Sequence, residues 1–174
     1  MSSRWVNINT SISQDGLGVP VVSIFFSYCD KKDITGCFCP NCQNKVLQKD
    51  GVGFNLNLYE IKQILDDKLN SMKILLGRDI GICFLGGEPM AEINRDMFMK
   101  LSEYYKDRFQ IAYTWRTPDL VENDWIKYID KTVCGEYVDE LNIGDKYILG
   151  STNQVVIDNN KNIILKYESE EKVK

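Results

Sequence analysis

A cluster of cysteines in a chain without histidine most constrains what this sequence can be. Four of the six cysteines lie within residues 29–42, CDKKDITGCFCPNC. Cys39 and Cys42 form a C-x2-C pair, a spacing that lets two sulfurs point at one metal centre, and Cys29 lies nine intervening residues upstream of Cys39. The absence of imidazole excludes Ser-His-Asp and Cys-His nucleophilic sites and every zinc site that needs histidine. The chemistry must therefore use thiolates, carboxylates, backbone groups or a cofactor.

Three interpretations of the cysteine loop remain open. Cys29, Cys39 and Cys42 could hold three irons of a [4Fe–4S] cluster and leave the fourth iron open. All four thiolates, Cys37 included, could instead close a structural zinc site, although such sites usually draw on two C-x2-C pairs and only one is present. In the third interpretation the cysteines bind no metal. Two further cysteines stand inside apolar segments and are expected to be buried, inert thiols: Cys83 and Cys134.

Composition predicts one soluble domain spanning 1–174, with a charged tail at 168–174. The chain is 44% apolar and 26% charged, and no run is long and apolar enough for a membrane span. The polar N-terminus lacks a signal-peptide core, so we expect a cytoplasmic protein with reduced thiols. The net charge of −4 comes from interspersed residues, which predicts neither a nucleic-acid partner nor a membrane-surface partner.

Apolar segments alternate between strand-like and helix-like patterns along the chain. Strands are expected at 19–28, 79–85, 109–115 and within 125–135, helices at 56–72 and 95–107, and a hairpin at 155–167. Such alternation is typical of an α/β domain with a largely parallel sheet. Ligands of parallel sheets gather at the carboxyl ends of the strands.

A second distinctive loop, GGEP, follows the strand expected at 79–85. Gly86 and Gly87 let the backbone approach a ligand closely, and the Glu88 carboxylate suits a ligand ammonium. Both loops follow strands, so they should face the same opening. Thr114 ends the next strand and is a candidate for the same site.

The two loops together resemble those of radical S-adenosylmethionine (SAM) enzymes, and in particular the anaerobic ribonucleotide reductase activating proteins. The resemblance rests on CPNCQN with Asn44, on GEYVDEL at 135–141 and on GSTNQ at 150–154, and it covers roughly residues 5–158. The family's usual C-x3-C-x2-C loop is lengthened here to a nine-residue first gap. Cys37 is thereby an alternative to Cys29 as first ligand.

The resemblance implies a fold, a chemistry and partners. The fold would be an open partial (β/α) barrel with a mostly parallel sheet and a core at about 19–158. A [4Fe–4S] cluster on Cys29, Cys39 and Cys42 would reductively cleave SAM, and the resulting radical would take a hydrogen from a glycine of the large subunit of an anaerobic ribonucleotide reductase. A low-potential electron donor such as flavodoxin would supply the electron. The residues implied in cofactor binding are Gly86, Gly87, Glu88, Thr114 and Asn44. The alternatives are a radical SAM enzyme acting on a small molecule, such as a 7-carboxy-7-deazaguanine synthase, and a zinc-stabilised binding module.

Overall fold

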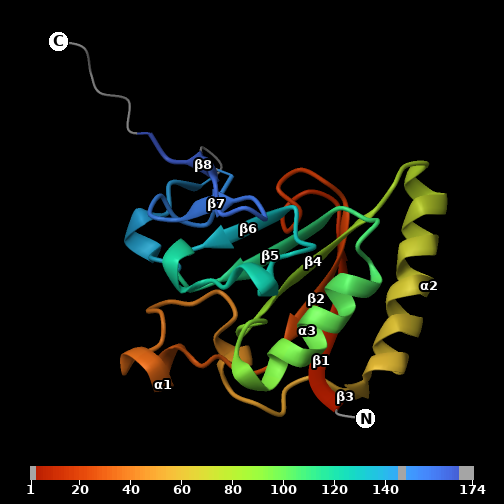
Figure 1. Ribbon diagram of the computed structural model, residues 1–174, viewed down its shortest axis with the longest axis horizontal. Helices are drawn as coiled ribbons and strands as arrows, with labels where there is room; N and C mark the ends of the chain where they lie inside the picture. Colours follow the sequence, from red (N-terminus) through yellow and green to blue (C-terminus); the bar gives the residue numbers. More distant parts are fainter. Residues whose placement is uncertain (1–2, 145–147, 169–174) are drawn as a thin grey trace.

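The computed structural model describes residues 3–144 and 148–168 and contains one eight-stranded sheet (Figure 1). The strands run in the spatial order β3-β1-β2-β4-β5-β6-β7-β8. Their bounds are β1 Ser3–Ser11, β2 Val21–Phe26, β3 Phe54–Asn57, β4 Gly81–Gly86, β5 Gln110–Thr114, β6 Lys131–Cys134, β7 Val155–Ile157 and β8 Ile163–Lys166. Apart from its first residue, the charged tail expected at 168–174 lies outside the described residues.

In the part of the chain that the structure describes, three α-helices and four short 3-10 helices connect the strands. They are α1 Lys31–Thr35, η1 Lys45–Gln48, α2 Leu58–Leu76, α3 Glu92–Tyr104, η2 Pro118–Leu120, η3 Asn123–Trp125 and η4 Asp139–Leu141. The helices expected at 56–72 and 95–107 are thus confirmed as α2 and α3. In the described part of the chain, no helix is both long and apolar enough to cross a bilayer.

The sheet is mixed, and the expectation of an open partial (β/α) barrel with a mostly parallel sheet is wrong. Only the pairings β2–β4, β4–β5 and β5–β6 are parallel, whereas the other four are antiparallel. The cause lies at the two ends of the chain. β1 leads through residues 12–20 into its antiparallel neighbour β2 and also pairs with β3, and β7 and β8 form the expected hairpin. Connections too short for a crossover can join only antiparallel neighbours, which accounts for the pairings β1–β2 and β7–β8.

The helix α2 shows how local sequence sets an element's limits. The side chain of Asn57 accepts hydrogen bonds from the backbone N–H groups of Tyr59 and Glu60, and the Glu60 carboxylate accepts from the backbone N–H of Asn57. This capping box satisfies N–H groups that a helix start leaves unpaired. At the other end Gly77 adopts a left-handed conformation with φ 63° and closes the last turn.

The two faces of the sheet carry separate apolar clusters. The larger cluster packs α2 and α3 against one face, with an edge-to-face contact between Phe84 and Phe98 whose ring centres are 5.1 Å apart. The smaller cluster, on the opposite face, includes Leu85, Val133 and Leu149. Both helices therefore cover the same side of the sheet, and the other side is covered by loops. The candidate site lies on this second side.

Candidate functional site

A cavity of about 430 Å³ opens at the carboxyl ends of the parallel strands. Gly86, Thr114 and Gly135 line it at the ends of β4, β5 and β6, and Leu85 and Leu149 line it from the smaller apolar cluster. The strand ends meet there because the parallel registers place Phe26 beside Gly86 and Thr114 beside Cys134. The expectation that both loops face one opening is confirmed by this common lining.

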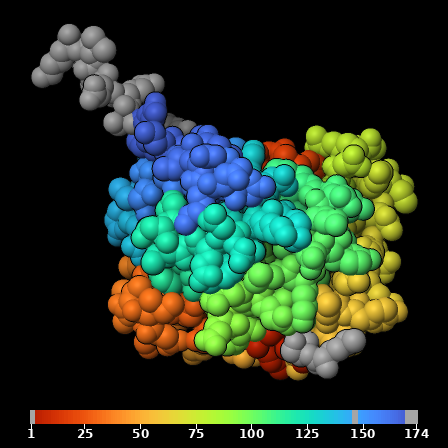
Figure 2. Space-filling view, viewed as in Figure 1, coloured from red at the N-terminus to blue at the C-terminus, as the bar shows by residue number. Residues whose placement is uncertain are grey.

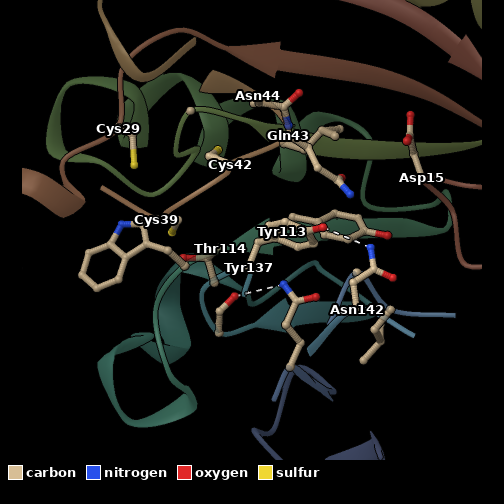
Figure 3. A pocket seen from close by; sticks show the side chains of 18 of the residues that line it. Asp15, Cys29, Cys39, Cys42, Gln43, Asn44, Tyr113, Thr114, Tyr137 and Asn142 are labelled. Carbon is tan, nitrogen blue, oxygen red and sulfur yellow. Dashed lines mark hydrogen bonds between the residues drawn. The ribbon is translucent and has the colours of Figure 1, made fainter. Parts of the chain in front are cut away.

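Three of the four loop cysteines line this cavity. Cys29 follows β2 and is buried, whereas Cys39 and Cys42 lie on the next loop and are half-buried. Figure 3 shows their side chains together at one end of the cavity. Cys37 is exposed and is not part of the lining. Its sulfur lies 3.9 Å from the Lys31 ammonium. The other two cysteines, Cys83 and Cys134, are buried inside strands, as expected.

Burial disfavours the charged form of the cavity thiols. It raises the pKa of Cys29 to about 12, and a hydrogen bond from the backbone N–H of Lys31 offsets only part of this effect. Burial also raises the pKa of Cys39, against the nearby Lys31 ammonium and a hydrogen bond from the backbone N–H of Tyr137. Thiols of this kind stay protonated until a metal displaces the proton.

The consecutive glycines of GGEP allow the backbone of this loop to pass close to neighbouring backbone segments. A Cβ on Gly87 would stand 2.3 Å from the carbonyl oxygen of Tyr28 and 2.5 Å from that of Leu47. A Cβ on Gly86, whose φ is 121°, would stand 2.4 Å from the carbonyl oxygen of Phe26. Both glycines also line the cavity. They are thus required by the packing of the loop before Cys29, and they leave backbone exposed to the cavity.

Glu88 is fully buried and is not among the residues that line the cavity. It accepts hydrogen bonds from the Thr114 hydroxyl at 2.9 Å, the Trp115 backbone N–H at 3.1 Å and the Met90 backbone N–H at 3.0 Å. Burial raises the pKa of Glu88 to about 7, although the Arg116 guanidinium acts in the opposite direction. The structure therefore brings Glu88 and Thr114 together, with Glu88 bonded to the protein itself.

Arg116 joins three segments around the site and was not expected from the sequence. Its Nη2 donates to Asp30 at 2.5 Å, and its Nη1 lies 3.3 Å from the Glu88 carboxylate, an ion-pair distance without hydrogen-bond alignment. Asp30 also accepts a hydrogen bond from the indole of Trp115 at 3.0 Å. Asp30 directly follows Cys29, so these contacts tie the cysteine loop to the ends of β4 and β5. In Figure 2 this loop, in orange, lies against the green to teal surface of the β5 region.

The cavity extends away from the cysteines between polar side chains. Asn44, a sequence candidate, lines it near Cys42, while Tyr113, Tyr137 and Asn142 lie further along (Figure 3). The far end is lined by Asp15, whose carboxylate accepts a hydrogen bond of 2.6 Å from the Ser23 hydroxyl. Tyr137 belongs to the GEYVDEL segment noted in the sequence, whereas Tyr113, Asn142 and Asp15 belong to no motif that sequence reasoning could have used.

The GSTNQ segment closes one wall of the cavity. The Gln154 side chain donates to the Gly135 carbonyl oxygen at 3.0 Å and accepts from the Ser151 backbone N–H at 3.2 Å. Asn153 donates to the Glu136 carbonyl oxygen at 2.9 Å. This segment is thereby held to the chain that leaves β6.

Comparison with known proteins gives one family. A family model described as a 4Fe-4S single cluster domain matches residues 14–157. The chain belongs to this family. A search of the curated proteins gives no match. As a 4Fe-4S single cluster domain, the protein is an iron–sulfur protein, and the match spans both the cysteine loop and the GGEP loop.

The cavity residues fit a cluster of this kind. Cluster irons take thiolate ligands, and the cavity wall offers the three thiols of Cys29, Cys39 and Cys42. Among residues 3–144 and 148–168, no three cysteine or acidic side chains gather closely enough to hold a single metal ion. A closed four-thiolate zinc site would need all four sulfurs around one ion, whereas Cys37 is exposed and is not part of the cavity lining.

Proposed function

We propose that this iron–sulfur protein is a radical SAM activating enzyme that generates a glycyl radical on an anaerobic ribonucleotide reductase. The observation that carries the proposal is the shared cavity, in which a three-cysteine set and the GG backbone line one wall. A cluster held by these three cysteines would leave one iron for the amino and carboxylate groups of SAM. When bound, the cluster and SAM together supply a reductive cleavage that ends in removal of a glycine hydrogen.

The chain's own residues take distinct parts in this proposal. Cys29, Cys39 and Cys42 hold the cluster, and the backbone at Gly86 and Gly87 contacts the methionine part of SAM. Glu88 acts as a positioning residue, because its carboxylate fixes Thr114 and the chain after β5 rather than lining the cavity.

Polar side chains suit the rest of the cavity to a nucleoside and a backbone segment. Asn44 and Tyr113 line the cavity beyond the cysteines, and neither side chain forms a hydrogen bond with any residue of 3–144 or 148–168. Amide and hydroxyl groups can donate and accept, which matches nucleoside hydroxyls as well as peptide groups. The proposed partners are the glycine-bearing large subunit of the reductase and a low-potential donor such as flavodoxin.

The test uses anaerobically reconstituted full-length protein. With dithionite and SAM, we expect methionine and 5′-deoxyadenosine to form. With the large subunit of the reductase added, we expect a glycyl-radical signal by electron paramagnetic resonance (EPR). A reductase whose target glycine is replaced by alanine is the matched control and should give no signal. SAM cleavage without any glycyl radical would overturn the activase assignment.

A radical SAM enzyme acting on a small molecule is the second candidate. The long gap between Cys29 and Cys39 favours it, because such enzymes can carry insertions there. SAM cleavage that depends on a low-molecular-weight substrate such as a pterin, and not on the reductase, would select this candidate.

A further inference from the structure

An ion pair between the buried ammonium of Lys31 and the partly exposed carboxylate of Glu136 lies beside the cysteine loop. The ammonium of Lys31 is 2.9 Å from the Glu136 carboxylate, and the Lys31 side chain is only 6% exposed. The same ammonium donates to the carbonyl oxygen of Cys37 at 3.3 Å. A buried ammonium costs free energy unless it is paired, and an apolar side chain could fill the same space. The position therefore carries a charge at a cost to stability.

The two charged residues flank two of the cavity sulfurs. Lys31 lies two residues after Cys29, and Tyr137, next to Glu136, lines the cavity together with Cys39. Both charges also act on Cys39, the Lys31 ammonium favouring its thiolate and the Glu136 carboxylate opposing it. The Lys31 ammonium and the Glu136 carboxylate thus act on the same sulfur in opposite directions, and solvent screens the buried cation less than the partly exposed anion.

The nine-residue gap after Cys29 is what makes this arrangement possible. Lys31 is the first residue of α1, the helix that the inserted segment forms, and α1 ends at Gly36 just before Cys37. Glu136 comes from the other side of the cavity, directly after Gly135 at the end of β6. The ion pair therefore connects the inserted segment with the chain that leaves the sheet.

We propose that the Lys31–Glu136 pair sets the reduction potential of the cluster, with Lys31 raising it and Glu136 lowering it. The proposal rests on Cys29, Cys39 and Cys42 as the cluster ligands. One-electron reduction adds a negative charge to the cluster, so a nearby cation stabilises the reduced form and a nearby anion destabilises it. Neighbouring charges are among the factors that spread cluster potentials over a wide range.

The test is a potentiometric titration of reconstituted protein without SAM, followed by the EPR signal of the reduced cluster. Lys31→Met is expected to shift the midpoint to more negative potential and Glu136→Gln to more positive potential. At the wild-type midpoint, each variant should change the ratio of reduced to oxidised cluster by about threefold or more, in opposite directions. The double variant should return close to the wild type.

Two controls separate charge near the cluster from charge in general. Lys32→Met removes the same charge from the next residue, which is exposed and stacks on Phe38, and should leave the midpoint almost unchanged. Lys31→Arg keeps the charge and should behave like the wild type. Shifts of Lys31→Met and Glu136→Gln in the same direction, or no larger than that of Lys32→Met, would overturn the proposal.

The outcomes also distinguish this proposal from the proposed function. Iron content and the spectrum of the wild type report on the ligand set before any variant is made, and a wild type without a cluster would overturn both. If Lys31→Met fails to take up iron, Glu136→Gln alone decides, since that side chain is 43% exposed and glutamine keeps a carbonyl oxygen that can accept from the Lys31 ammonium. A missing glycyl radical would leave this titration unaffected.

Discussion

The guanidinium of Arg116 and the carboxylate of Asp30 form a nearly buried ion pair across 86 positions of sequence, with 2.5 Å between Nη2 and Oδ2. Asp30 adjoins Cys29, and Arg116 follows β5 by two residues. The pair therefore fixes where the cysteine loop begins relative to the central strands. Loss of this ion pair should lower the stability of the fold and should also disturb the position of the cysteine loop at the site.

Arg116→Met should lower the free energy of unfolding by about 3–5 kcal/mol, because it leaves the buried carboxylates of Asp30 and Glu88 without their cation. Urea denaturation of the apoprotein measures the change. Lys100→Met breaks an exposed pair with Asp96 and should cost less than about 1 kcal/mol. Equal losses in the two variants would contradict the role assigned to Arg116.

The raised pKa of Glu88 predicts a pH-dependent stability. The pKa rises from 4.5 to about 7 on folding, so the folded state binds more protons than the unfolded state between these values. The contribution of Glu88 is then fully present below pH 4.5 and is lost as pH rises through 7, by about 3 kcal/mol.

This dependence can be isolated because the chain has no histidine to titrate in the same range. Denaturant unfolding of the apoprotein between pH 5 and pH 8 should show stability falling in the wild type. Glu88→Gln should remove most of that slope. Parallel curves for the two proteins would refute the prediction.

Gly87→Ala should destabilise the apoprotein by about 3 kcal/mol, because its Cβ would collide with two backbone carbonyl groups. Gly77→Ala is the matched control. It also adds one methyl group, but into open space at a left-handed helix end, at a cost of about 1 kcal/mol. Thermal unfolding compares the two variants, and a Gly87→Ala protein as stable as Gly77→Ala would show that the loops are not in tight contact.

Alanine substitutions at the four loop cysteines test the ligand set. Cys29→Ala, Cys39→Ala and Cys42→Ala should each lose most of the roughly four irons per chain of the reconstituted wild type, whereas Cys37→Ala should keep them. Iron analysis and visible absorption give the answer. A cluster retained in Cys29→Ala and lost in Cys37→Ala would reverse the choice of first ligand.

The central strands, the two long helices and the C-terminal hairpin were predictable from the sequence, whereas β1 and β3 were not. The strands β2, β4 and β5 are continuous apolar runs, and α2 and α3 have clear helical stripes, so local pattern alone identifies them. β1 alternates Trp5, Asn7 and Asn9 on one side with Val6 and Ile8 on the other, and this polar segment was not recognised as a strand. Missing β1 and β3 led directly to the wrong expectation of a mostly parallel sheet.

The candidate site likewise has a part that could be predicted from local sequence and a part that could not. The cysteine loop and GGEP are local patterns, and the structure places them at one cavity. Arg116 with Asp30 and Lys31 with Glu136 are joined only through the tertiary fold, and nothing in their local sequence pairs them. The hydrogen bonds of the Glu88 carboxylate could not be predicted from the sequence either, because they come from Thr114 at the end of β5 and from Trp115 directly after it.

The separation of Cys29 from Cys39 and Cys42 has a mechanical consequence. Cys29 is anchored at the end of a buried strand, whereas the other two belong to a loop at the surface. A group bound by all three sulfurs would hold that loop in a fixed position against the sheet. Oxidative loss of the group would then loosen the outer wall of the cavity, so that damage by oxygen would reach the surface presented to a partner as well as the chemistry inside.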